Sequence, residues 1–116
     1  MTQSLEDRIR AIEDRLEIYN LIASHPPSAD TGADYYTRAA YVEDGELDLG
    51  RGKATGNETI AAVTKTPAHQ AAIAGGLAHF AGLPRIELDG DRAVVISYLQ
   101  ILTPHPTAEP HEVPNH

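Results

Sequence analysis

Three side chains near the end of this 116-residue chain belong to types that can move a proton and hold a polar group. They are the imidazole of His79, the phenol of Tyr98 and the amide of Gln100. A neutral imidazole accepts a proton near pH 7, and an amide or a phenol can hydrogen-bond a small molecule. Together they would predict proton transfer or ligand binding. A histidine on a strand is also common as a structural residue, and that interpretation stays open.

A β-hairpin is expected to bring these side chains together. The Asp-Gly pair at residues 89–90 separates two apolar runs, and this pair is typical of a type I′ turn, whose positive φ angles glycine adopts without strain. If Leu88 faces Asp91 across the turn, His79 lies opposite Gln100 and the tyrosine is a diagonal neighbour. One face of the sheet would then carry all three side chains.

Strict alternation along the first strand of this hairpin conflicts with a pocket on that face. It places Arg85 and Glu87 on the same side as His79, where charged groups do not suit an apolar pocket. Proline in a strand is typical of an edge or a bulge, and one extra residue moves every later side chain to the other face. We therefore expect a bulge at Pro84.

The length and composition of the chain indicate a single acidic domain. Its 9 Lys and Arg residues and 17 Asp and Glu residues give a net charge of −8, so nucleic acid and anionic membranes are not expected as partners. The chain has no cysteine, which excludes disulfides, thiolate catalysis and cysteine-based zinc sites. It has neither a signal-peptide core nor a run of about 18 apolar residues. We expect one cytoplasmic domain over residues 1–116.

A long amphipathic helix is predicted from about Leu5 to Ser24. Ser4 and Asp7 resemble a capping box. Apolar residues recur at helical spacing, namely Leu5, Ile9, Ile12, Leu16, Tyr19 and Ile22. We expect the Ile9, Ile12 and Leu16 stripe to pack on the sheet and solvent to surround Asp7, Arg8, Glu13 and Asp14. His25-Pro26-Pro27 should end the helix, because proline cannot continue the hydrogen-bond ladder.

The middle of the chain is predicted to add short elements. They are a polar connection over 28–32 that contains Asp30, a helix over 33–40, a strand over 46–49, a flexible loop over 50–56, and a helix from Asn57 that Pro67 either breaks or follows with a second helix through 74. Together with the hairpin, this order predicts an α+β fold, with helices gathered on one face of an antiparallel sheet.

Several short stretches resemble the SnoaL-like branch of the nuclear transport factor 2-like superfamily. They are residues 12–18 (IEDRLEI), 30–32 (DTG), 41–45 (YVEDG), 79–80 (HF) and 85–93 (RIELDGDRA), and the resemblance covers roughly residues 5–105. It implies a cone-shaped α+β barrel, in which a curved antiparallel sheet wraps around the long N-terminal helix and leaves a pocket at the open end. Relatives continue with at least two further strands, so we expect C-terminal strands to be missing from these 116 residues.

The functional likeness is to scytalone dehydratase and its bacterial relatives. That family has an aspartate after the first helix, a histidine in a His-Phe pair, and a second histidine in a Pro-His pair. Asp30, His79 and His105 stand at the matching positions. A similarity of this chain to hexachlorocyclohexane dehydrochlorinase would also imply that Asp30 pairs with His79. Candidates for the tyrosines that hold a substrate oxygen in the family are Tyr19, Tyr36 and Tyr98.

The resemblance implies a cofactor-independent lyase or isomerase that acts on a small apolar ring or carbonyl compound. In an elimination next to a carbonyl group, His79 would take the α-proton, while Asp30 would fix the tautomer of the ring and stabilise its charged form. This chemistry needs no metal or organic cofactor, and the histidines and glutamates after residue 108 match no closed zinc site.

Two further expectations complete the sequence-based interpretation. A non-catalytic domain of the same fold, which binds a small ligand or assembles with a partner, is the alternative to an enzyme, because a fold alone does not define a function. We also expect a homo-oligomer, formed through apolar residues on the exposed face of the sheet around Val95, Leu99 and Ile101.

Overall fold

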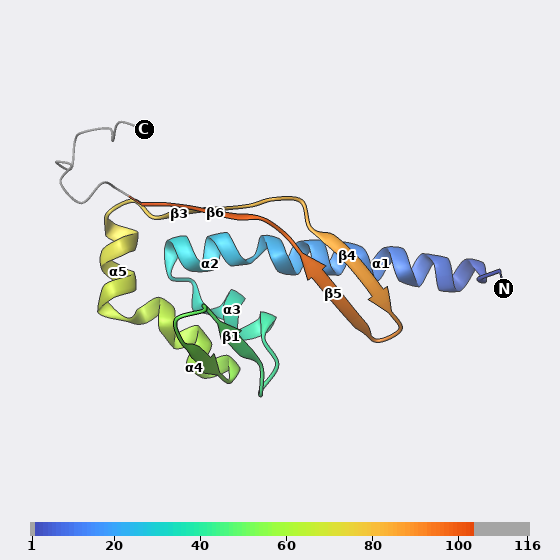
Figure 1. The fold of residues 1–116 in the computed structure, drawn as a ribbon, viewed down its shortest axis with the longest axis horizontal. Coiled ribbons are helices and arrows are strands. Elements are labelled where there is room, and N and C mark those ends of the chain that lie inside the picture. Colours follow the sequence, from blue (N-terminus) through green and yellow to red (C-terminus); the bar gives the residue numbers. More distant parts are fainter. Residues whose placement is uncertain (1, 104–116) are drawn as a thin grey trace.

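The computed structural model describes residues 2–103, and it combines helices with antiparallel strand pairs. In chain order, its elements are α1 (Leu5–Ala23), α2 (His25–Thr31), α3 (Asp34–Ala40), β1 (Glu46–Asp48), β2 (Lys53–Thr55), α4 (Asn57–Ala62), the 3₁₀ helix η1 (Val63–Lys65), α5 (Pro67–Ala74), β3 (Ala78–Ala81), β4 (Arg85–Asp89), β5 (Arg92–Ile96) and β6 (Leu99–Leu102). Figure 1 shows α2 following α1, with the strands β3 to β6 beside both helices and α3 to α5 gathered near α2. The predicted α+β class is confirmed.

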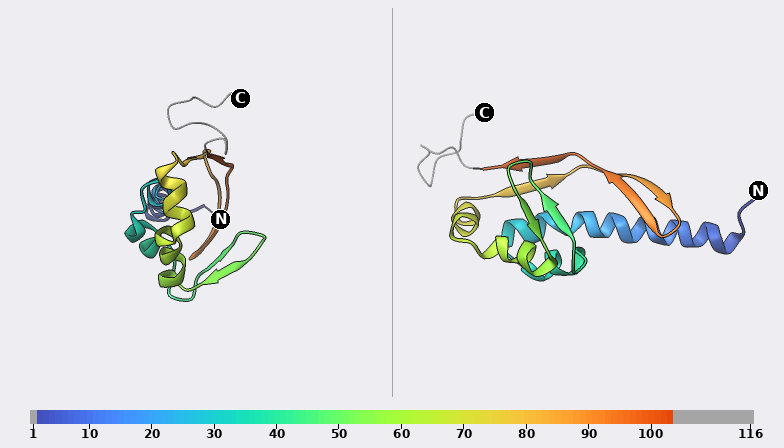
Figure 2. Two further views of the ribbon diagram at one scale, coloured as in Figure 1. Left: turned by 90° about the vertical axis from the view of Figure 1, so that its left-hand side faces the viewer. Right: turned by 60° about the horizontal axis from the view of Figure 1, so that its bottom comes forward.

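The strands form three separate antiparallel pairs, β1–β2, β3–β6 and β4–β5. Figure 2 shows the β1–β2 hairpin rising from the helices toward the β3–β6 ladder without joining it. Within residues 2–103 the strands therefore do not close into the barrel that the resemblance implies. The loop expected over residues 50–56 contains β2, so that part of the prediction is wrong.

The start of α1 follows the prediction. The backbone N–H of Asp7 donates to the Ser4 hydroxyl at 3.1 Å, and Ser4 itself is extended, as an N-cap residue should be. Glu6 and Asp7 place negative charge in the first turn, where it interacts favourably with the free N–H groups. The helix ends at Ala23, one residue before the expected end.

The buried face of α1 differs from the prediction. Ile12 and Leu16 are 58% and 60% exposed, so the apolar stripe does not pack on the sheet. Asp14, expected in solvent, is half-buried, and Arg15 on the same side donates to the carbonyl oxygen of Ile86 at 3.0 Å. The half-buried positions in the middle of α1 are Ala11, Asp14, Arg15 and Ile18, so the face that packs is offset from the predicted stripe and carries polar as well as apolar residues.

The connection expected over residues 28–32 is instead part of helix α2. Pro26 and Pro27 lie in its first turn, where proline is tolerated because the N–H groups have no helical partner. Gly32 ends the helix with a φ of +75°, a value that glycine adopts without steric cost. Asp30 is therefore held on a helix whose residues Ser28 and Ala29 are buried.

Helices α3, α4 and α5 form a small core with α2. Pro67 begins α5 rather than breaking a helix, and Thr66 caps it by accepting a hydrogen bond from the His69 backbone N–H at 3.3 Å. Ile60 is 2% exposed and Ala61 is fully buried. The core that positions the candidate site therefore lies among the helices.

The pairing register of the long hairpin differs from the expected one by two residues in the β4–β5 pair and by one residue in the β3–β6 pair. Asp89 pairs with Arg92, so Gly90 and Asp91 are the central turn residues and Leu88 pairs with Ala93. Gly90 has a φ of +57°, and within the described residues no residue other than glycine has a positive φ, as in a type II′ turn rather than the predicted type I′.

The expected bulge at Pro84 is confirmed. Between the pairs Ala81–Leu99 and Arg85–Ile96, one strand has residues 82, 83 and 84 and the other only 97 and 98. One extra residue shifts the side chains beyond it to the other face. Ile86 is accordingly buried, whereas Arg85 and its neighbour Glu87 are exposed.

Candidate functional site

Asp30 of α2 and His79 of β3 meet at the centre of the candidate site. The backbone N–H of His79 donates to Asp30 Oδ2 at 2.9 Å, and its ring nitrogen Nδ1 lies 2.6 Å from Asp30 Oδ1. The side chains are 8% and 22% exposed for His79 and Asp30, respectively. The expected pairing of Asp30 with His79 is therefore present in the structure.

This two-point contact fixes the ring of His79. An ionised carboxylate can only accept hydrogen bonds, so Nδ1 carries a proton and its N–H donates a hydrogen bond to Asp30. In the neutral ring, Nε2 is then the unprotonated nitrogen. A histidine arranged in this way can act as a base, and the carboxylate stabilises the positive charge that the ring gains.

Two further histidines lie near this pair. The rings of His25 and His79 make an edge-to-face contact, with centroids 5.1 Å apart and planes at 88°. His69 Nε2 lies 2.6 Å from the carbonyl oxygen of Ala29, and this bond connects α5 with α2. Burial and the neighbouring rings of His79 and His69 lower the pKa of His25 from 6.5, although the Asp30 carboxylate acts in the opposite direction.

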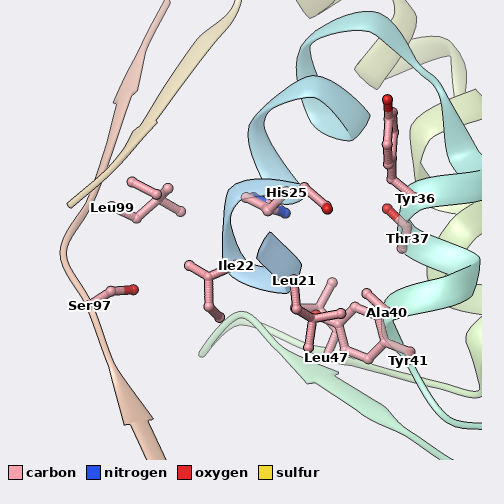
Figure 3. Close-up of a pocket in the computed structure, with 12 residues that line it drawn as sticks. Leu21, Ile22, His25, Tyr36, Thr37, Ala40, Tyr41, Leu47, Ser97 and Leu99 are labelled. Carbon is pink, nitrogen blue, oxygen red and sulfur yellow. The ribbon is translucent and has the colours of Figure 1, made fainter. Parts of the chain in front are cut away.

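A cavity of about 400 Å³ opens beside the histidines. Figure 3 shows side chains from the helices on one side of this cavity and Ser97 and Leu99 on the other. Its lining is mainly apolar with a few polar groups and consists of Leu21, Ile22, Ser24, His25, Tyr36, Thr37, Ala40, Tyr41, Leu47, Ala81, Ser97 and Leu99. Such a lining suits a small, largely apolar molecule with one or two polar groups.

The polar groups of the cavity come mainly from α2, α3 and the residues that flank them. The Thr37 hydroxyl lies 2.5 Å from that of Ser28, which fixes it against α2. Burial raises the pKa of Tyr41 above its usual 10.0, so its hydroxyl stays neutral and able to donate. Tyr36 packs against Tyr35 with ring centroids 4.3 Å apart.

The structure brings together some of the predicted site residues and separates others. Tyr36 lines the cavity, but Tyr19 on α1 is not among the described residues that do. Tyr98 is 91% exposed. The expected position of Gln100 opposite His79 is wrong, because His79 pairs with Ile101 and Gln100 pairs with Phe80 on the other face of the ladder.

His105, with the histidines and glutamates after residue 108, lies outside the described residues. Within residues 2–103, no group of three or more His, Cys, Asp or Glu side chains is arranged to hold a metal ion. None of the helices in that range is long and apolar enough to span a membrane.

His25 is the site residue that the sequence interpretation missed. The sequence predicts it only as the end of the first helix, whereas in the structure it is the first residue of α2 and lines the cavity. His79 is not among the described cavity-lining residues, although Ala81 on the same face of β3 is. The signal for His25 was the Pro26-Pro27 pair, which is as typical of the first turn of a helix as of a stop.

Comparisons with known proteins agree on the family. A family model described as a SnoaL-like domain matches residues 10–115. The crystal structure, at 1.16 Å resolution, of an NTF2-like protein with a cystatin-like fold from Novosphingobium aromaticivorans is 35% identical and superposes with a TM-score of 0.83, covering 90% of this chain and 68% of that one. No curated protein matches the chain. Proteins of this family bind small molecules, and isomerases and dehydratases are among them. The chain belongs to the SnoaL-like domain family of the NTF2-like superfamily.

Proposed function

We propose that this protein is a cofactor-independent lyase or isomerase, similar to scytalone dehydratase in reaction class, that uses His79 and Asp30 for acid–base chemistry. The observation that carries the proposal is the double contact of Asp30 with the backbone N–H and the ring Nδ1 of His79. The bond from the backbone N–H holds the carboxylate in place, and the bond from Nδ1 then holds the ring in one orientation and tautomer. That is the requirement for a base that must meet a substrate in one geometry.

The substrate class follows from the cavity beside this pair. Its lining is mainly apolar, and its polar groups are hydroxyls and one imidazole rather than ionised groups. A small ring compound with a carbonyl or hydroxyl group fits this environment better than a phosphate or a carboxylate. His79 Nε2 would take a proton from the carbon next to the carbonyl group, and the charged ring would return it to another carbon or to a leaving hydroxyl. His105 remains a proposed partner in this step.

The proposal is tested by the exchange of α-protons for deuterium in a ring ketone. We would incubate 2-tetralone with the protein in D₂O and follow loss of the α-proton signals by NMR. His79→Ala should reduce the protein-dependent rate to background. His69→Gln is the matched control, because its side chain can still donate to the Ala29 carbonyl, and it should exchange at the parent rate. Parent-like exchange by His79→Ala would contradict the proposal.

A non-catalytic ligand-binding domain is the second candidate function. It is favoured by one observation, that His79 contacts the ring of His25 but is not itself among the described residues that line the cavity. In that case His79 and Asp30 would serve to connect β3 with α2. A parent protein that binds 2-naphthol, a planar analogue of the enol form of 2-tetralone, but exchanges no α-protons would support this second function.

A further inference from the structure

We infer that His25 is a second catalytic residue, which donates an N–H hydrogen bond from its neutral ring to the carbonyl oxygen of the substrate. The inference rests on the proposed function, since it assigns a role in the same proton transfer. It starts from position, because His25 is the only imidazole among the described residues lining the cavity and its ring touches that of His79.

The hydrogen bonds of the three neighbouring histidines separate their roles. His79 Nδ1 is bonded to Asp30, and His69 Nε2 is bonded to the Ala29 carbonyl oxygen. The residues from 2 to 103 provide no comparable partner for the ring of His25, whose contact with His79 is through the ring edge and face. His25 can therefore offer an N–H group to a molecule in the cavity.

The charge around His25 favours its neutral form. Two imidazolium rings with centroids 5.1 Å apart would repel each other, so a proton on His79 opposes a proton on His25. Burial and His69 act in the same direction, Asp30 acts against them, and the net effect is a lowered pKa for His25. A neutral imidazole is a suitable donor to a developing enolate, because its N–H can donate a hydrogen bond without the ring gaining or losing a proton.

The two histidines then divide one reaction step. A bond forms between the α-proton and His79 Nε2 as the C–H bond breaks, and the electron pair of that bond moves into the C–C–O system to give an enolate. The enolate oxygen accepts the hydrogen bond from His25. His79 returns its proton to another carbon in an isomerisation. In a dehydration it gives the proton to the leaving β-hydroxyl, which departs as water.

The test compares His25→Ala with His25→Gln, because glutamine keeps a neutral N–H donor and alanine does not. In the 2-tetralone exchange assay, His25→Ala should lower kcat by about 10² to 10³-fold, as removal of one donor to an enzyme-bound oxyanion does. His25→Gln should stay within about tenfold of the parent and keep the shape of its pH–rate profile, since a neutral donor does not titrate in the reaction. Binding of 2-naphthol, followed by its fluorescence, should weaken in His25→Ala and be largely retained in His25→Gln. Circular dichroism would confirm that each variant is folded.

The outcomes separate this inference from the proposed function. Parent-like exchange and 2-naphthol binding by His25→Ala would overturn the role of His25 alone, provided that His79→Ala is inactive. Equal loss of exchange in His25→Ala and His25→Gln, with one limb of the pH profile removed, would show instead that His25 itself exchanges a proton. Parent-like exchange by His79→Ala would overturn the proposed function. A parent protein that neither exchanges 2-tetralone nor binds 2-naphthol would overturn both.

Discussion

The substitution Asp30→Asn tests the candidate site most directly, because it keeps the shape of the side chain and removes its charge. The carboxylate accepts from the His79 backbone N–H at 2.9 Å and from the ring Nδ1 at 2.6 Å. An asparagine has one accepting oxygen and one donating nitrogen. If the oxygen keeps the backbone N–H, the amide nitrogen faces Nδ1, and His79 must shift its proton to Nε2. The nitrogen that should act as the base is then already protonated.

The expected magnitudes for stability and turnover are different. A hydrogen bond to a charged group contributes about 1.5–3 kcal/mol and a neutral one about 0.5–1.5 kcal/mol. Asn can replace the two charge-assisted bonds of Asp30 with two neutral bonds, so Asp30→Asn should lower the free energy of unfolding by about 1–2 kcal/mol. Asp30→Ala loses both bonds and leaves the buried His79 donors unpaired, which should cost about 3–5 kcal/mol. Turnover by Asp30→Asn should fall by about 10² to 10⁴-fold with little change in KM, as expected when the base is held in the wrong tautomer.

Urea denaturation and the 2-tetralone exchange assay measure these two effects on the same samples. Asp34→Asn is the matched control, because Asp34 pairs with Arg38 on α3 at a partly exposed position, and its loss should change stability by less than about 1 kcal/mol and leave turnover unchanged. The reasoning is refuted if Asp30→Asn is folded and exchanges substrate within about threefold of the parent rate. It is refuted equally if Asp30→Asn lowers kcat no more than Asp34→Asn does.

Three further predictions concern pH, the core and association. The pKa of His25 is lowered in the folded chain, so the unfolded chain binds more protons between that pKa and 6.5. Stability should therefore fall as the pH decreases through this window. Thermal unfolding of His25→Gln should show a weaker fall than that of the parent. Ile60→Ala should lower the free energy of unfolding in urea by about 2–4 kcal/mol, whereas Leu83→Ala, at a position 86% exposed, should change it by less than about 0.5 kcal/mol. The association face expected around Val95, Leu99 and Ile101 is displaced in the structure, because Val95 is half-buried and Leu99 lines the cavity. The neighbouring Val94 and Ile96 are 60% and 63% exposed, and we expect them to promote self-association. Ile96→Glu should therefore shift the parent oligomer toward monomer in light scattering, and a monomeric parent would contradict this.

The residues of the candidate site were predictable to different degrees, for physical reasons. Asp30 and His79 were found through their family positions, although local pattern alone would not have paired residues 49 positions apart. His25 was not found, because proline both ends one helix and begins the next, and the sequence offers no local way to choose between these effects. The start of α1 was predictable because the contact of Ser4 with Asp7 is local. The face that α1 buries was not, because it depends on which strands lie beside the helix.

The turn and the bulge at Pro84 together show how the pairing register decides which residues share the face of His79. The sequence Asp89-Gly90-Asp91 allows glycine at either central position of a two-residue turn. With glycine second, as predicted, the amide of Gln100 faces His79. The structure has glycine first, which moves the register by two residues and by itself leaves Gln100 on the His79 face. The extra residue at the Pro84 bulge then moves the β3–β6 register by one and puts Gln100 on the opposite face. A change of one residue in the pairing exchanges the two faces of a strand, because side chains alternate with a period of two.

The corrected register also shifts the polar part of the site from the sheet to the helices. The residues that share the His79 face of the ladder are Ala81, Leu99 and Ile101, so the strands provide an apolar wall around one imidazole. The groups that can recognise a substrate oxygen therefore come mainly from α2, α3 and their flanking residues, where His25 and Tyr36 line the cavity. Helix α2 carries both Asp30, which holds the His79 ring, and His25, which lines the cavity. A change in the position of this helix would move both residues together, whereas Gln100, on the other face of the ladder, has no direct route to the proposed proton transfer.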